Sequence, residues 1–230
     1  MDNNLISIIM PVHNQAGHIE RIIERYINKL KKLPLPYEMI LVVNGCTDDS
    51  LDLSNKLKER YENVKVINIE KSGWGRAVIA GLKSSEGGLL CFTNSARTSD
   101  GDLLQSLLYA TANADVVVKA NRKIRDSWVR SAGSILYNIE CRTLFDLSCW
   151  DINGTPKIFP RRFERLFSLT ENGNLLDLEF NIICKEEGYP MIEIPIFSSY
   201  RHSGSSTTGL RSAFKMFWKA FLISRERNQK

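Results

Sequence analysis

Residues 5–30 read LISIIMPVHNQAGHIERIIERYINKL, and they contain one complete strand-and-helix unit. The opening residues form an apolar, β-branched run that Pro11 stops, which is typical of a buried strand. The residues that follow predict a helix, because apolar side chains recur at the spacing of one buried stripe. The stripe consists of Ile19, Ile22, Ile23, Tyr26, Ile27 and Leu30.

The same order of strand and helix repeats along the first half of the chain. Further strands are expected at residues 37–43, 64–69 and 89–92, and helices are expected through residues 51–61 and 76–84. Continuous apolar strands that alternate with helices predict an α/β fold, in which a mostly parallel, Rossmann-like sheet carries helices on both faces.

The second half of the chain is less regular. Strands are expected at residues 115–119, within residues 151–159 and at residues 191–196, and helices at residues 128–145 and 175–187. The chain contains no internal repeat, low-complexity tract or linker. We therefore expect one domain over residues 1–209, followed by a basic amphipathic helix over residues 210–230.

The composition is that of a globular protein, since 43% of the 230 residues are hydrophobic and 25% are charged. No apolar run reaches the roughly 18 residues of a membrane-spanning helix, and the first residues lack the pattern of a secretory signal. The five cysteines never form a C-x-x-C pair. This spacing disfavours a zinc site or a disulfide framework and predicts a cytoplasmic protein in a reducing compartment.

Ligands of parallel sheets bind beyond the carboxyl ends of the strands, where the loops of this chain carry its motifs. No G-x-G-x-x-G follows the first strand and no G-x-x-x-x-G-K-[ST] occurs, which disfavours dinucleotide dehydrogenases and P-loop NTPases. The order of the loops is more informative than any single one. The segments in question are residues 8–14 (IIMPVHN), 42–48 (VVNGCTD), 73–81 (GWGRAVIAG), 151–161 (DINGTPKIFPR), 177–179 (DLE), 193–195 (EIP) and 201–206 (RHSGSS).

Taken together, these segments resemble family 2 glycosyltransferases of the polyprenyl-phosphate branch, over nearly the whole chain to about residue 207. The resemblance implies the GT-A fold, a nucleotide-sugar donor and a lipid-phosphate acceptor. It implies catalytic roles for Asp151, Arg122 and Arg201, and it places Lys157 and Ser205 on the acceptor side. The donor site that it implies consists of Pro11, Val12, His13, Asn14, Asn44, Gly73, Gly75, Arg76, Thr93, Asn94 and Ser95.

The loop after the fourth expected strand departs from the family pattern. In the family it carries Asp-x-Asp, which holds a divalent cation against the donor diphosphate, but here Thr93 and Ser95 take the two acid positions. Neutral hydroxyls are poor ligands for Mg²⁺ or Mn²⁺. Gln15, Val43 and Thr155 are further departures from the motifs. The loop therefore does not support a metal site, and the cofactor is left open.

A literal Asp-x-Asp does occur nearby, at Asp100-Gly101-Asp102. These acids fit the start of the helix near Leu103, where carboxylates cap the first turn and complement its dipole. The alternative is a displaced metal site, which requires the loop to fold back on itself.

Expulsion of a nucleoside diphosphate requires positive charge near the leaving oxygen, from a metal or from basic side chains. A lipid-phosphate acceptor is already ionised, so it needs positioning more than a general base. Asp151 is the best acid in the region, and it either acts on the acceptor side or anchors its own loop. The basic candidates are Arg76, Arg97, Lys119, Arg122, Lys157 and Arg201.

The C-terminal segment carries an uneven charge. Residues 209–230 hold six positive charges and one negative charge, interleaved with Phe, Trp, Met, Leu and Ile. Either this is a helix with a solvated basic face that packs on the core, or it lies on an anionic membrane surface. The width of the apolar stripe favours the membrane, at the cytoplasmic side.

Three functions are compatible with these observations. The first is a GT-A glycosyltransferase that moves a sugar from a nucleotide donor to a polyprenyl phosphate or a similar acceptor. The second is an inactive donor-binding regulator or subunit, suggested by the missing acids. The third is a transferase to a soluble saccharide or small molecule. No nucleic-acid partner is expected.

Overall fold

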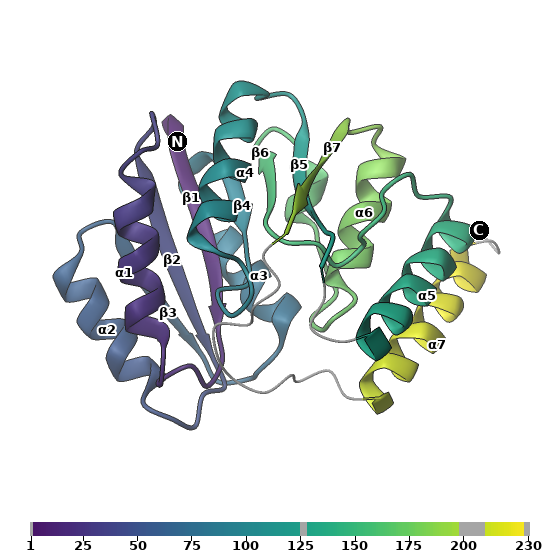
Figure 1. The fold of residues 1–230 in the computed structure, drawn as a ribbon, viewed down its shortest axis with the longest axis horizontal. Helices are drawn as coiled ribbons and strands as arrows, with labels where there is room; N and C mark the ends of the chain where they lie inside the picture. The colour runs from purple at the N-terminus through teal and green to yellow at the C-terminus, as the bar shows by residue number, and fades with distance from the viewer. Residues whose placement is uncertain (1, 125–127, 198–209, 228–230) are drawn as a thin grey trace.

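A seven-stranded sheet runs through the middle of the computed structural model, which describes residues 2–124, 128–197 and 210–227 (Figure 1). Its strands are β1 (Asp2–Val12), β2 (Tyr37–Asn44), β3 (Val64–Ile69), β4 (Gly87–Phe92), β5 (Val117–Arg122), β6 (Lys157–Pro160) and β7 (Met191–Ile196). Their order is β3-β2-β1-β4-β6-β5-β7. Strand β6 is antiparallel to β4 and β5, and the other pairs are parallel.

Helices cover both faces of this sheet, as the sequence predicts. They are α1 (Ile19–Leu30), α2 (Ser50–Arg60), α3 (Trp74–Lys83), α4 (Asp100–Ala112), α5 (Trp128–Phe145), α6 (Leu176–Glu186) and α7 (Leu210–Arg227), with a 3₁₀ turn η1 (Glu164–Phe167). Helices α1, α2 and α4 share one apolar cluster with the sheet, whereas α3 and α6 share another. Helices α5 and α7 form a third cluster against the outer side of α6 (Figure 1).

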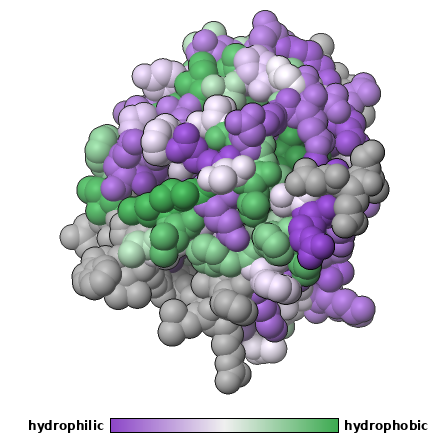
Figure 2. Space-filling model, turned by 90° about the vertical axis from the view of Figure 1, so that its right-hand side faces the viewer, coloured by the Kyte–Doolittle hydropathy of each residue, from purple (hydrophilic) through white to green (hydrophobic). Residues whose placement is uncertain are grey.

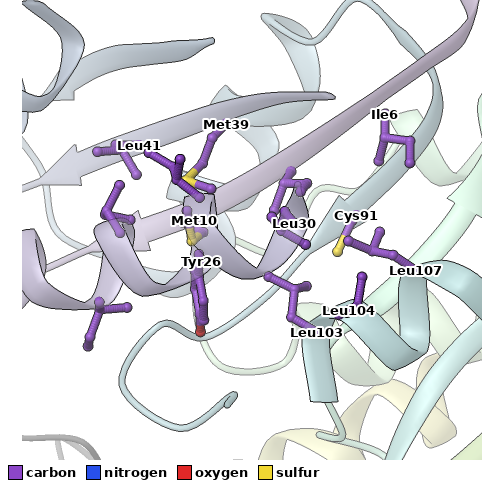
Figure 3. Packing of buried hydrophobic residues seen from close by; sticks show 14 of the residues in the cluster. Ile6, Met10, Tyr26, Leu30, Met39, Leu41, Cys91, Leu103, Leu104 and Leu107 are labelled. Atoms are coloured by element: carbon purple, nitrogen blue, oxygen red, sulfur yellow. The ribbon is translucent and has the colours of Figure 1, made fainter. Parts of the chain in front are cut away.

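Alternating side chains of the strands belong to the two main apolar clusters, because successive residues of a strand point to opposite faces of the sheet. Figure 3 shows Tyr26 and Leu30 of α1 close to Met10 of β1, and Leu103 of α4 near Cys91 of β4. Each such fully buried apolar side chain contributes about 1.5–3 kcal/mol. These contacts hold the loops at the carboxyl ends of β1, β2 and β4 on a rigid base.

In the first half of the chain, the strands and the buried helix stripe lie close to where the sequence predicts them. All six residues of the predicted stripe on α1 are buried, and four strands occur where they are predicted. The fifth strand is shifted, since it covers Val117–Arg122 instead of residues 115–119. It extends further because its polar end is buried and pairs with β7 up to Arg122 opposite Ile196. The turn η1 is not predicted by the sequence.

Within the described ranges, no helix has the length and apolar character needed to cross a membrane.

Candidate functional site

The loops that follow β1, β2 and β3 are joined at the carboxyl edge of the sheet by the side chain of Asn44. Its amide nitrogen donates to the carbonyl of Val12 at 2.7 Å, and its oxygen accepts from the N–H of Gly73 at 3.1 Å. The side chain is 3% exposed, and both of its polar atoms have backbone partners. Asn44 therefore positions the predicted donor loops, and its own place in the donor site stays a prediction.

The first of these loops presents His13 and Asn14, whereas Pro11 and Val12 before them are buried. The Nδ1 of His13 lies 2.7 Å from the carbonyl oxygen of Asn44, so Nδ1 carries the proton and Nε2 is an acceptor when the ring is neutral. Asn14 has a φ of 49°, and its side-chain oxygen accepts from Thr47 N at 2.8 Å. The loop is thereby preformed.

The glycine turn before α3 is shaped by a second chain segment. A Cβ on Gly73 would lie 2.7 Å from the carbonyl oxygen of Asn172, and one on Gly75 would lie 1.9 Å from that of Glu171. The N–H of Arg76 donates to the same Asn172 oxygen at 3.0 Å. The two glycines are therefore required by close contact with the segment before α6, which the sequence did not indicate.

Two buried donors in this turn have no hydrogen-bond partner. They are the indole Nε1 of Trp74 and the guanidinium Nε of Arg76. Buried donors are almost always satisfied, because an unpaired one costs about 1–3 kcal/mol. Their position at the carboxyl edge of the sheet fits a ligand that supplies acceptor oxygens, such as a diphosphate.

The loop after β4 turns its hydroxyls inward. Thr93 Oγ1 donates to Thr98 Oγ1 at 2.8 Å, and Ser95 Oγ donates to Gln15 Oε1 at 2.8 Å. Thr93 and Ser95 are both completely buried. Asn94 holds the turn, since its carbonyl accepts from Thr98 N at 2.9 Å.

These contacts decide whether the residues present fit the divalent cation that the family pattern implies. The acid positions carry hydroxyls that are neutral, buried and already hydrogen-bonded, so they offer no ligand set for a hard cation. Among the described residues, no group of three or more His, Cys, Asp or Glu side chains is placed to hold a metal. The residues therefore do not fit the metal.

The nearby Asp100 and Asp102 belong to the start of α4, in agreement with the capping alternative. Ser99 is the N-cap and accepts from Asp102 N at 3.0 Å, while the Asp102 carboxylate accepts from the Ser99 hydroxyl at 2.8 Å. Asp100 forms an ion pair with Arg25 of α1 at 2.7 Å.

Asp151 and Arg122, both predicted to be catalytic, bind each other. Arg122 donates to the Asp151 carboxylate from its backbone N at 3.0 Å, from Nε at 2.7 Å and from Nη2 at 2.8 Å. Asp151 is 1% exposed and the Arg122 side chain 18%. Both carboxylate oxygens are occupied, which favours the alternative that Asp151 anchors its loop.

Lys119 and Lys157 were expected on loops that face the site, but both lie on strands and are completely buried. They lie on β5 and β6, where the sheet is covered on both faces. Lys119 Nζ donates to the backbone oxygen of Asp151 at 2.6 Å and to Asn181 Oδ1 at 3.1 Å. Lys119 also lies 3.5 Å from Glu193, whose carboxylate accepts from the N–H of Asp151.

Lys157 forms an ion pair with Asp177 of α6, over the rings of Phe92 and Phe180. Burial lowers the pKa of Lys157, and its attraction to Asp177 opposes that shift. These lysines and acids fasten residues 151–157 beneath the edge of the sheet, so the acceptor-side role of Lys157 stays a prediction.

Arg201 and Ser205 lie outside the described residues. The structure also adds residues that the sequence did not single out for the site, namely Trp74, Gln15 and Asn181. Gln15 was noted only as a departure from a motif, and its partner Ser95 is 80 positions away in the sequence.

Solved structures share this fold. Glucosyl-3-phosphoglycerate synthase from Mycobacterium tuberculosis, in complex with Mn²⁺, uridine-diphosphate and phosphoglyceric acid, has a TM-score of 0.74 at 16% identity, over 96% of this chain and 78% of that chain. The same enzyme with uridine-diphosphate has a TM-score of 0.69 at 15% identity, over 97% and 80% of the two chains. At these identities the likeness establishes the fold, which is GT-A like.

Two sequence relatives match most of this chain. The undecaprenyl-phosphate 4-deoxy-4-formamido-L-arabinose transferase of Proteus mirabilis (strain HI4320) is 29% identical over 208 residues, which are 88% of this chain and 62% of that protein. The protein of that name from Serratia proteamaculans (strain 568) is 24% identical over 219 residues, or 93% and 65%. The chain thus spans less than two thirds of either relative. The model of glycosyl transferase family 2 matches residues 7–172, and the chain belongs to this family.

Proposed function

We propose that this chain transfers a sugar from a nucleotide-sugar donor to a polyprenyl phosphate or an acceptor of similar chemistry. The observation that carries the proposal is the pair of unpartnered donors on Trp74 and Arg76, in the glycine turn of a family 2 fold. A diphosphate supplies the acceptor oxygens that these donors lack. Family membership supports the nucleotide sugar as the compound that contains it.

In the transfer, the bond between the sugar carbon and the diphosphate oxygen breaks, and an oxygen of the acceptor forms the new bond. Negative charge grows on the leaving diphosphate, and we assign its stabilisation to the guanidinium of Arg76. Neutral Thr93 and Ser95 repel a diphosphate less than two unpaired carboxylates would. No step requires Asp151 to take a proton from the acceptor, because an acceptor phosphate is already ionised at neutral pH.

The choice of acceptor rests on the relatives. Both sequence relatives are named for transfer to undecaprenyl phosphate, and a similar fold was solved with phosphoglyceric acid. A phosphate-bearing acceptor is common to the two groups. We favour the lipid because of the exposed surface of α5 and α7.

That surface carries large exposed apolar side chains and lies on one side of the molecule. Figure 2 shows hydrophobic residues gathered on the side that carries α5 and α7, with hydrophilic residues beside them. The large exposed apolar residues of the two helices are Ile135, Leu136, Ile139, Trp218, Phe221 and Leu222. Basic residues of α7 accompany them, among them Lys215, Lys219 and Arg225. Such a combination fits the boundary of an anionic bilayer, so we propose peripheral binding at the cytoplasmic face.

A panel of UDP-, GDP- and CDP-sugars tests the transfer, with undecaprenyl phosphate in vesicles or a soluble phosphorylated acceptor. We expect sugar transfer to the lipid from one donor class. Binding without turnover of any donor would instead support an inactive regulator, which the neutral acid positions favour. Turnover that requires only the soluble acceptor would support the third function.

A further inference from the structure

A hollow of about 480 Å³ separates the loop before α6 from the C-terminal helix α7. The loop contributes its residues 170–175 to the wall, and α7 contributes the opposite wall. The complete lining is Thr170, Glu171, Asn172, Gly173, Asn174, Leu175, Lys215, Met216 and Lys219. None of the candidate residues predicted from the sequence lies in this loop, and the proposed transfer does not use it.

The loop wall is preformed by protein contacts. The carboxylate of Glu179 accepts from the N–H of Thr170 at 2.9 Å and from that of Glu171 at 2.9 Å. The carbonyl of Asn172 accepts from Arg76 N at 3.0 Å. The shape of the loop wall therefore does not depend on a bound ligand, and one loop contacts the glycine turn and lines the hollow.

The helix wall is positively charged. Lys215 and Lys219 are four positions apart on α7, so they lie on the same side of the helix, and both are exposed. In the described part of the chain neither lysine has a carboxylate partner, whereas Arg227 near the end of α7 pairs with Glu186. Two neighbouring like charges repel each other, and a bound anion relieves that repulsion.

We propose that this hollow binds the phosphate group of the acceptor, an inference that rests on the proposed function. A phosphate monoester has close to two negative charges and three strong acceptor oxygens, which suit two ammonium groups and the amide of Asn172. Leu175 and Met216 supply apolar surface for the carbon chain attached to the phosphate. The shared chemistry is a phosphate monoester, either on a lipid or on a soluble molecule.

The test compares Lys215→Ala/Lys219→Ala with Lys56→Ala/Lys58→Ala. The control removes the same charge from exposed positions of α2, at the opposite end of the molecule (Figure 1). Three probes separate the sources of phosphate. The first is a vesicle that contains phosphatidic acid, which is a lipid phosphate monoester. The second is a vesicle that contains phosphatidylglycerol at equal surface charge, and the third is soluble glycerol phosphate.

We expect the wild-type chain and the control to bind a monoester probe, and the Lys215/Lys219 variant to bind it about thirtyfold more weakly, at roughly 1 kcal/mol for each lysine. A loss for phosphatidic acid that exceeds the loss for phosphatidylglycerol identifies a lipid phosphate, and a loss for glycerol phosphate identifies a soluble one. Equal losses for both kinds of vesicle would overturn the proposal, since the lysines would then act only as general charge. Absence of binding to either monoester by the folded wild-type chain would also overturn it.

Measurements of sugar transfer by the wild-type chain and the double variant test this inference separately from the proposed function. If the double variant transfers sugar like the wild type, the hollow is not the acceptor site and the proposed transfer stands. If the wild-type chain transfers no sugar from any donor, the proposed function fails, whatever the phosphate probes show.

Discussion

Replacing Asp151 by alanine tests the role that the structure gives to this carboxylate. The substitution removes the partner of three donors of Arg122, at 2.7, 2.8 and 3.0 Å. Removal of one member of a buried ion pair costs about 3–5 kcal/mol. Because the Arg122 side chain is 18% exposed, water compensates part of the loss, and we expect a decrease of about 3 kcal/mol in the free energy of unfolding.

Urea unfolding, followed by tryptophan fluorescence and circular dichroism, measures this decrease. Asp115→Ala is the matched control, because Asp115 also pairs with an arginine, Arg162, but is 86% exposed. Exposed pairs contribute about 0–1 kcal/mol, so the control should be close to the wild type.

A loss in Asp151→Ala no larger than that of the control would refute the anchoring role. If that stable variant also failed to transfer sugar, Asp151 would return as a residue that acts on the substrate. An anchoring role predicts loss of stability together with loss of activity.

Three further variants test other parts of the structure. Gly75→Ala places a Cβ 1.9 Å from a backbone carbonyl oxygen, so we expect a loss of about 1–3 kcal/mol in urea unfolding, while Gly133→Ala, with nothing within 4 Å, should lose none. Glu38 is buried, which opposes its ionisation, but hydrogen bonds from Lys65 and Ser7 hold its pKa below the usual value. Glu38→Gln should therefore lower the free energy of unfolding by about 1–3 kcal/mol at pH 7. This difference between wild type and variant should persist above the unfolded pKa of about 4.3 and disappear as the pH falls through the lower folded pKa. A difference that grows in acid would contradict the assignment. Replacing Trp218 and Phe221 by serine should release the chain from anionic vesicles in co-sedimentation at low salt, and unchanged binding would show that α7 faces something other than the bilayer.

The sequence predicted those parts of the fold in which periodicity and burial agree. The stripe on α1 is complete because Ile19 to Leu30 face a single layer of strands. Strand β5 was predicted to end at Lys119 because Asn121 and Arg122 look like surface residues. Asn121 is buried, and its amide donates to Glu193 of β7, a long-range contact that a local pattern does not contain.

The candidate site was also predicted only in part. The order of the motifs predicted which loops lie at one edge of the sheet, but it did not predict the contacts between them. The hydrogen bond from Ser95 to Gln15 joins residues 80 positions apart, and the glycines of the turn are explained by a segment almost 100 positions later in the chain. The apolar surface of α5 was not predicted either, since the apolar residues of α5 extend around the helix and do not reveal its exposed face.

The most direct test of the account measures release of nucleoside diphosphate from the preferred donor, in the presence of acceptor, with EDTA or with added Mg²⁺ or Mn²⁺. The central claim is that this family 2 chain transfers sugar with neutral, internally hydrogen-bonded residues at the acid positions, so the rate in EDTA should stay within about twofold of the rate with metal. Complete loss in EDTA that Mg²⁺ or Mn²⁺ restores would contradict the claim, and it would make Asp100, Asp102 or another acid a metal ligand.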